Sequence, residues 1–311
     1  MYRRSLMLTA PYQLQWMEER LSSLKSNEIL VRTLAGAISI GTELPIYQGL
    51  HRGSTPIKYP KMTGYESYAE VIECGDHVKD FVVGQRIIAF YGHRTHAILP
   101  IAKAIPVPND ITPDFALLVI LGCDVTNGIN KLEVENDAEI LITGAGTIGL
   151  LTLFNLLHRG FNQIDVVEPF AERRRLAEEM GARKAIAPSQ LDVVTAKYEA
   201  GFECSSRNEA FELMQKSMQP GGQISVLADG NLEPLILLPD FHEKELKIFG
   251  SSDGEDYQGY AKQFWEMVHS AEFDLSRLYE KKISKRQLSD CFRELADGQE
   301  RPIKVFVDYS D

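Results

Sequence analysis

Short apolar and alternating runs recur along roughly the first 110 residues and are separated by residues that favour turns. Turn signals such as Cys74–Gly75–Asp76 and Val83–Gly84 stand between them. Closely spaced short strands of this kind predict a small, barrel-like β domain. The runs are Ser5–Leu8, Glu28–Thr33, Tyr68–Ile72, Gln85–Phe90 and Thr95–Leu99, and the segment from Gly49 to Pro60, with Gly, Pro and several basic residues, is predicted to be a loop.

After Pro106 the pattern changes to helices that alternate with short apolar strands. Residues Ile111–Leu132 are predicted to be helical, with Thr112 as the N-cap and Pro113 in the first turn. Strands alternating with helices predict a parallel, doubly wound sheet. The other predicted helices are 150–157, 169–180, 208–218, 257–271 and 285–295, and the predicted strands are 140–142, 164–167, 184–186, 200–204, 223–227, 245–250 and 303–307.

One stretch, Glu139–Glu168, has the pattern of a dinucleotide-binding unit. A buried strand is followed by glycines at Gly144, Gly146 and Gly149, then by an apolar helix, a second strand and the acid Glu168. In such a unit the first glycine allows a tight turn, the second lets a pyrophosphate approach the backbone, and the third lets the helix pack on the sheet. The free N–H groups at the helix start favour phosphate charge.

The acid at the end of the second strand bears on which nicotinamide cofactor binds. Glu168 can accept hydrogen bonds from both ribose hydroxyls of NAD, and it would repel the 2′-phosphate of NADP. The nearby basic run Arg173–Arg174–Arg175 keeps NADP(H) possible, although such a run is also typical of a solvated helix face. We therefore expect NAD(H) to be preferred.

Composition narrows the class of protein further. The 311 residues are enough for two domains, and the formal net charge of −11 argues against nucleic acid or an anionic membrane as the main partner. The four cysteines are scattered, as in a protein of the reducing cytoplasm. The apolar run Phe115–Leu121 is too short to span a bilayer, and the N-terminus lacks the apolar core of a signal peptide.

Several motifs, in this order, resemble the medium-chain dehydrogenase/reductase family over nearly the whole chain. They are AISIGTELPIYQG (37–49), TGYESYAEVIECG (63–75), VGQRI (83–87), LGCDVTNGI (121–129), GAGTIG (144–149), MQPGGQISVL (218–227), KELKIFGSS (244–252) and RPIKVFV (301–307). The resemblance implies an α/β fold: a Rossmann cofactor domain over 125–251, and a β-rich, GroES-like catalytic domain over 1–124 and 252–311. It also implies a homodimer, for which the apolar segment Leu232–Leu238 is a candidate interface.

Two departures from the family pattern concern zinc. Ile40 stands where zinc members carry a cysteine, and Tyr65 stands where they carry a histidine, so that only Cys123 matches a ligand position. A catalytic zinc needs three protein ligands, so we expect no bound metal. The cysteine-rich lobe for structural zinc is also absent, because the chain runs directly from Phe90 to His96. Locally, SIGTE and TGYES are similar to the bacteriochlorophyllide-dehydrogenase branch.

The resemblance also implies which residues would line the site. Thr42 and Tyr65 would carry hydroxyls near the nicotinamide, where a donor can stabilise or protonate the reacting oxygen. Thr42 could instead cap a turn and Tyr65 could be a packing aromatic, while Glu66 would support the site. The implied cofactor contacts are Gly144, Gly146, Thr147, Ile148, Gly149, Glu168, Arg173, Thr126, Ser205, Leu227, Gly250 and Lys304.

The sequence thus predicts a zinc-independent, NAD(H)-dependent oxidoreductase that transfers hydride to or from a carbonyl or alcohol carbon of a small organic molecule. Two alternatives stay open: reduction of an activated C=C bond, and a non-catalytic NAD-binding redox sensor. A basic loop with His51, Arg52, Lys58 and Lys61 could meet an anionic substrate, or could simply be solvated.

Overall fold

The computed structural model describes residues 1–50, 56–229 and 232–310, which form two compact units. One unit comprises Met1–Val119 with Leu275–Asp311, and the other comprises Ile120–Asp274. The predicted division ended the cofactor domain at residue 251, whereas residues 252–274 belong to the second unit here. The α/β fold class, with a parallel Rossmann-type sheet and a β-rich domain, is confirmed. His51 and Arg52 lie outside the described residues.

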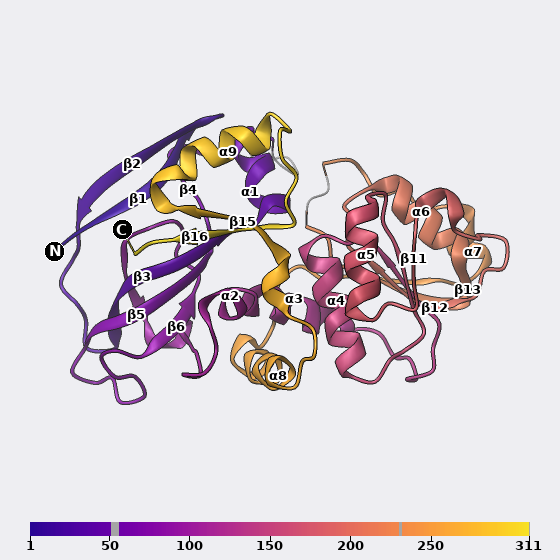
Figure 1. Ribbon diagram of the computed structural model, residues 1–311, viewed down its shortest axis with the longest axis horizontal. Helices are drawn as coiled ribbons and strands as arrows, with labels where there is room; N and C mark the ends of the chain where they lie inside the picture. Colours follow the sequence, from indigo (N-terminus) through magenta and orange to yellow (C-terminus); the bar gives the residue numbers. More distant parts are fainter. Residues whose placement is uncertain (51–55, 230–231, 311) are drawn as a thin grey trace. The chain divides into compact units, whose positions relative to one another are not determined.

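The first unit contains two sheets (Figure 1). A three-stranded sheet has the order β2-β1-β4, and a larger sheet has the order β15-β16-β3-β5-β6-β8, with β7 paired to β3. The bounds are β1 Tyr2–Ala10, β2 Gln13–Arg20, β3 Glu28–Ile38, β4 Lys61–Met62, β5 Glu66–Cys74, β6 Arg86–Ala89, β7 His96–Pro100, β8 Ile105–Pro106, β15 Tyr279–Ser284 and β16 Lys304–Asp308. The helices are α1 Ile40–Tyr47, α2 Pro113–Ala116 and α9 Leu288–Ala296.

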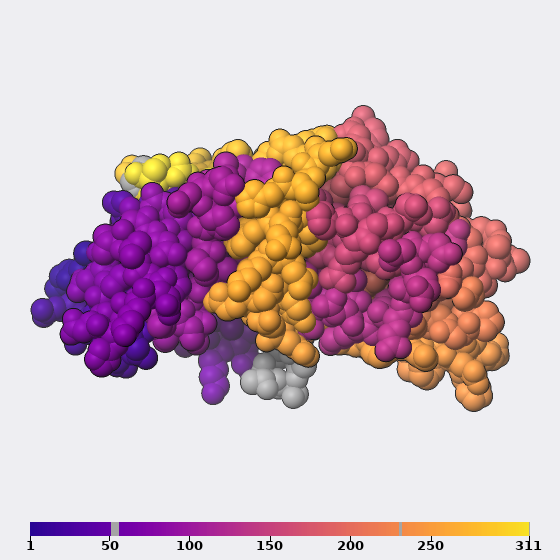
Figure 2. Space-filling view, turned by 90° about the horizontal axis from the view of Figure 1, so that it is seen from below, coloured from indigo at the N-terminus to yellow at the C-terminus, as the bar shows by residue number. Residues whose placement is uncertain are grey.

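The C-terminal strand completes the larger sheet. Strand β16 pairs antiparallel with β3, so that Val305 lies opposite Ile38 and Val307 opposite Gly36. Figure 2 shows these yellow C-terminal residues lying against the violet residues of the N-terminal part. The inward side chains of β1, β3 and β16 pack with Phe292 of α9 in one apolar core. Val305, Val307 and Tyr309 are therefore part of this unit's core.

The second unit is a parallel six-stranded sheet of order β11-β10-β9-β12-β13-β14. This is the order of a doubly wound fold made of two mononucleotide-binding halves. The strands are β9 Ile140–Thr143, β10 Ile164–Val167, β11 Lys184–Ile186, β12 Tyr198–Glu203, β13 Met218–Val226 and β14 Lys247–Gly250. The helices are α3 Val119–Ile129, α4 Thr147–His158, α5 Ala171–Met180, α6 Asn208–Ser217, α7 Pro239–Glu243 and α8 Tyr257–His269.

Apolar residues on both faces of this sheet explain its burial. Leu141 packs with Phe211 and Met214 of α6. Its neighbours Ile140 and Ile142, which point to the opposite face because side chains alternate along a strand, are also fully buried. A strand that is buried on both faces is a near-continuous apolar run, and this is why the sequence pattern indicated a parallel sheet.

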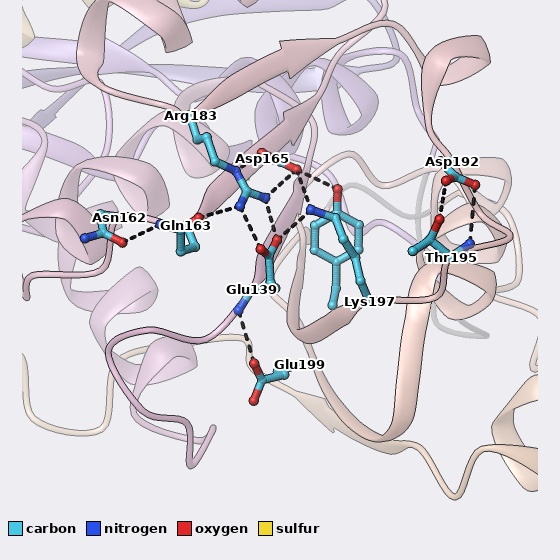
Figure 3. Close-up of polar contacts among 10 residues, drawn as sticks. Glu139, Asn162, Gln163, Asp165, Arg183, Asp192, Thr195, Lys197 and Glu199 are labelled. Carbon is cyan, nitrogen blue, oxygen red and sulfur yellow. Dashed lines mark hydrogen bonds and ion pairs between the residues drawn. The ribbon is translucent and has the colours of Figure 1, made fainter.

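A charged network holds the amino ends of the central strands (Figure 3). Arg183, just before β11, donates from Nε and Nη2 to the two carboxylate oxygens of Asp165, both at 2.7 Å. The same guanidinium donates to both oxygens of Glu139 at 2.8 and 2.5 Å. Lys197 reaches Glu139 at 2.6 Å, and the hydroxyl of Tyr198 donates to Asp165 at 2.8 Å. The network therefore ties β9, β10, β11 and β12 together at one end.

Some local predictions differ from the structure. The single helix expected over Ile111–Leu132 is two helices, α2 and α3, and Thr112 makes no capping hydrogen bond from its side chain. The helix expected over 285–295 begins as a short 3-10 turn, with α9 following at Leu288. The predictions missed strands β2, β4, β8 and β15 and helices α1 and α7. Strand β2 is mostly exposed, and α1 contains Pro45. In the described part of the chain, no helix is both long and apolar enough to cross a membrane.

Candidate functional site

The glycine-rich turn after β9 has the geometry that its spacing predicts. Gly144 has φ +90°, a conformation that other residues rarely adopt. A Cβ on Gly149 would lie 1.9 Å from the Gly144 carbonyl oxygen, so only glycine allows helix α4 to begin this close to the turn. A Cβ on Gly146 would meet no atom within 4 Å, which leaves open space beside the turn. Helix α4 begins there at Thr147 and Ile148, both partly exposed, and a helix N-terminus attracts anions.

The acid after β10 lies against this turn. Glu168 is 3% exposed, and its Oε2 accepts a hydrogen bond from the Ala145 N–H at 2.7 Å. Its Oε1 accepts another from the Phe170 N–H at 3.0 Å. The carboxylate is therefore held beside the glycines. Arg174 donates to the Glu168 carbonyl at 2.8 Å, while Arg173, the predicted ribose contact, lies over the Phe170 ring.

A cavity of about 490 Å³ lies at the carboxyl ends of β13 and β14. Gly250 lines it, as the predicted contacts imply. Ser205 follows β12, where its backbone N–H donates to Glu203 at 2.7 Å. Leu227 is buried and packs over Gly128, so that Ala228 takes the place on the cavity wall.

Thr126 does not lie on the cavity. It is fully buried, its hydroxyl donates to the Gly122 carbonyl at 2.8 Å, and it accepts from Asn155 at 2.9 Å. The next residue, Asn127, lines the cavity instead. A cofactor contact at Thr126 therefore stays a prediction from the family resemblance.

In the first unit, Tyr65 and Thr42 come together beside the start of α1. The Tyr65 hydroxyl donates to Ser39 Oγ at 2.5 Å, and its ring stacks on Phe90 with centroids 6.4 Å apart. Burial raises the pKa of Tyr65 well above its usual range, and the nearby carboxylates of Glu66 and Glu43 add to this rise. Hydrogen bonds with Ser39 and Thr42 oppose this rise. Tyr65 is therefore a neutral hydroxyl at physiological pH and can donate a hydrogen bond.

Glu66 and Lys304 form a buried ion pair. Lys304 Nζ lies 2.7 Å from Glu66 Oε1, and both side chains are at most 1% exposed. Burial raises the pKa of Glu66, and the Lys304 ammonium opposes this rise. Lys304 was expected to face the cofactor pyrophosphate, whereas in this structure its ammonium pairs with the Glu66 carboxylate inside the first unit. Pairing explains the burial, since an unpaired charge there would be costly.

A second buried pair was missed by the sequence reasoning. His93 is 2% exposed, with Nε2 3.3 Å from Glu43 Oε2 and Nδ1 3.4 Å from the Tyr309 hydroxyl. Glu43 also accepts from the backbone N–H groups of Ser39 and Gly64, both at 2.8 Å. The carboxylate thus holds the start of α1 against the chain just before Tyr65. No local sequence signal joins these residues, which are distant along the chain.

The residues at the family's zinc positions do not suit a metal ion. Ile40 has no donor atom, and a neutral tyrosine hydroxyl, such as that of Tyr65, is a poor zinc ligand. Cys123 is fully buried, its thiol lies 3.7 Å from the Tyr257 carbonyl as a hydrogen-bond donor, and burial raises its pKa well above the usual range. A cysteine binds zinc as the thiolate. Within residues 1–50, 56–229 and 232–310, no three His, Cys, Asp or Glu side chains gather in a way that could hold a metal.

Comparison with known proteins gives two family matches. Residues 25–99 match the alcohol dehydrogenase GroES-like domain, and residues 147–270 match the zinc-binding dehydrogenase family. An L-threonine 3-dehydrogenase of Thermococcus kodakarensis is 29% identical over 292 residues, which cover 79% of this chain and 81% of that protein.

Solved structures share the fold over almost the full length. A zinc-binding dehydrogenase of Sinorhizobium meliloti bound to NADP has a TM-score of 0.83 at 21% identity, covering 99% of this chain and 100% of the other. An Escherichia coli alcohol dehydrogenase complexed with NADH has a TM-score of 0.84 at 18% identity, covering 99% of each chain.

Proposed function

Because the chain belongs to the medium-chain dehydrogenase/reductase family and is an NAD(P)-dependent oxidoreductase, we propose that it is a zinc-independent member that prefers NAD(H). It would interconvert an alcohol and a carbonyl group of a small organic molecule. The observation that carries the proposal is the pairing of an intact glycine-rich turn with altered residues at the zinc positions. Its motifs SIGTE and TGYES are locally similar to the bacteriochlorophyllide-dehydrogenase branch, and this similarity does not fix a substrate.

The second unit would hold the cofactor. The open space at Gly146 and the start of α4 suit the pyrophosphate, and Glu168 is positioned beside the turn to meet a ribose. Bound nicotinamide would supply the hydride chemistry. Structures with NADP and with NADH among the fold neighbours support use of a nicotinamide cofactor.

The first unit would supply the proton donor. Tyr65 is a neutral hydroxyl held by Ser39, and a donor of this kind can stabilise negative charge on a substrate oxygen without a metal. Thr42 would support it, and Glu66 would be held away from the reaction by Lys304. An alcohol substrate is supported by the named L-threonine 3-dehydrogenase relatives.

The test is a screen of purified protein with NAD⁺ and NADH against alcohols, polyols, ketones and enones. We expect reversible turnover with an alcohol and carbonyl pair, activity that survives chelators, and no stoichiometric zinc by metal analysis. Turnover only with enones would favour C=C reduction. Tight NADH binding without any turnover would favour a non-catalytic sensor, and activity that chelators abolish would overturn zinc independence.

We further propose a homodimer of the reducing cytoplasm. The four cysteines are free thiols, and the segment after residue 231 exposes Leu232, Ile236 and Leu237, each about half. Strand β14 is the edge of the parallel sheet, so its outer hydrogen-bonding side is available to a second copy. Light scattering at micromolar concentration should give twice the mass of the chain, and a monomer would refute the proposal.

A further inference from the structure

The cavity at the ends of β13 and β14 has a mostly acidic lining, which the proposed function does not explain. In a fold of two mononucleotide halves, the glycine turn and Glu168 belong to the half formed by β9, β10 and β11. The other mononucleotide, which carries the nicotinamide, would therefore lie over the ends of β12, β13 and β14. The cavity opens at that place, between Ala228, Gly250 and Asn127.

The cavity wall is a built structure. Asn127 Nδ2 donates to the Asp253 carbonyl at 2.6 Å. Asp124 accepts from the Gly254 N–H at 2.9 Å and from the Tyr257 hydroxyl at 2.7 Å. These bonds fasten the segment after β14 to helix α3. The backbone of this segment is therefore held beside the cavity.

The charged side chains on the wall are mostly acidic. Asp229, Asp253 and Glu255 line the cavity with a single ammonium, that of Lys131. The Lys131 ammonium donates to the Gly250 carbonyl at 2.6 Å. Three carboxylates and one ammonium give the cavity a formal net charge of −2. Such a lining raises the local concentration of cations and repels anions.

The two forms of the cofactor differ in charge at this end. The oxidised nicotinamide ring carries one positive charge, and the reduced ring is neutral. A negative lining interacts differently with the two rings, and only a differential interaction shifts an equilibrium. On the basis of the proposed function, we propose that Asp253 and Glu255, together with Asp229, make the cavity bind oxidised NAD⁺ more tightly, relative to NADH, than a neutral lining would.

The expected effect is moderate, because these carboxylates are exposed at the cavity wall and solvent screens them. Each neutralised carboxylate should weaken NAD⁺ relative to NADH by about two- to fivefold, the usual size for an exposed charge pair. Removing the Lys131 ammonium should strengthen NAD⁺ binding relative to NADH binding. As the salt concentration rises, the ratio of NADH affinity to NAD⁺ affinity of the wild type should approach that of the neutralised variant, since salt screens exposed charges.

The experiment measures binding and needs no substrate. Dissociation constants are determined by calorimetry for NAD⁺ and by fluorescence for NADH, on wild type, Asp253→Asn, Glu255→Gln, the double variant and Lys131→Gln. Glu209→Gln, an exposed carboxylate of the same unit outside the cavity, is the matched control. Asp253→Asn keeps the backbone carbonyl that Asn127 binds, so the wall is retained.

We expect the NADH-to-NAD⁺ ratio of affinities to rise in both carboxylate variants, to rise further in the double variant and to fall in Lys131→Gln. Glu209→Gln should match wild type. A double variant whose ratio stays within twofold of wild type, or one that loses both ligands equally, overturns the proposal. Failure of wild type to bind either nucleotide would instead refute the proposed function.

Discussion

Replacing Arg183 by methionine tests the charged network at the amino ends of the strands. Asp165 is 2% exposed, and Arg183 supplies two of its hydrogen bonds. Removing one partner of a buried pair costs about 3–5 kcal/mol, because the remaining charge stays buried and uncompensated. Tyr198 at 2.8 Å and Lys197 at 3.4 Å still face Asp165 in the variant, so we expect the lower end, about 3 kcal/mol.

The pH dependence follows from the two carboxylates. Hydrogen bonds from Arg183 lower the pKa of Glu139 to about 2 and, against the effect of burial, also lower that of Asp165. A carboxylate whose folded pKa is depressed stabilises the fold above its unfolded pKa of about 4 and loses this effect as pH falls through the folded pKa. The difference in unfolding free energy between wild type and Arg183→Met should therefore be largest near pH 7 and should shrink between pH 4 and 2.

The assay is urea unfolding followed by tryptophan fluorescence. The chain has two tryptophans, Trp16 in the first unit and Trp265 in the second, so a Trp16→Phe background reports the second unit alone. Arg175→Met, an exposed arginine on α5 of the same unit, is the control and should change the unfolding free energy by less than about 0.5 kcal/mol. If Arg183→Met costs no more than Arg175→Met at pH 7, the network does not stabilise the unit.

Three further outcomes concern the cofactor and the proton donor. Tyr65→Phe should lower turnover by about 10²–10³ without changing NADH affinity, whereas the exposed Tyr2→Phe should turn over normally; equal turnover of both would make Tyr65 a packing residue. Glu168→Ala should narrow the gap between NADH and NADPH dissociation constants in fluorescence titrations, and wild-type protein that binds NADPH more tightly would contradict the NAD preference. Lys304→Met should cost about 3–5 kcal/mol in urea unfolding, because Glu66 is left buried and charged, and Glu66→Gln in the same chain should recover part of that loss.

The second unit was predictable because its signals are local. Buried parallel strands are apolar runs, glycines mark the turn, and an acid ends the next strand, all within residues 139–168. The structure bears out the roles of Gly144 and Gly149, where a side chain would clash or adopt a rare conformation. Strand β2 escaped prediction because it is exposed and its alternation is weak, so no local pattern separates it from a loop.

The sequence by itself determined the fold class, the glycine turn and the absence of donor atoms at Ile40, because each depends on residue type and short spacing. The tertiary structure decided which buried polar and charged side chains contact one another. Lys304 and Glu66 are 238 positions apart yet share a buried bond, and His93 meets Glu43 and Tyr309 only after β3, β5 and β16 have assembled. It also decided that Asn127, not Thr126, lines the cavity, since one step along a helix turns a side chain by about 100°. Such placements depend on pairing between distant segments, and no single stretch of sequence encodes them.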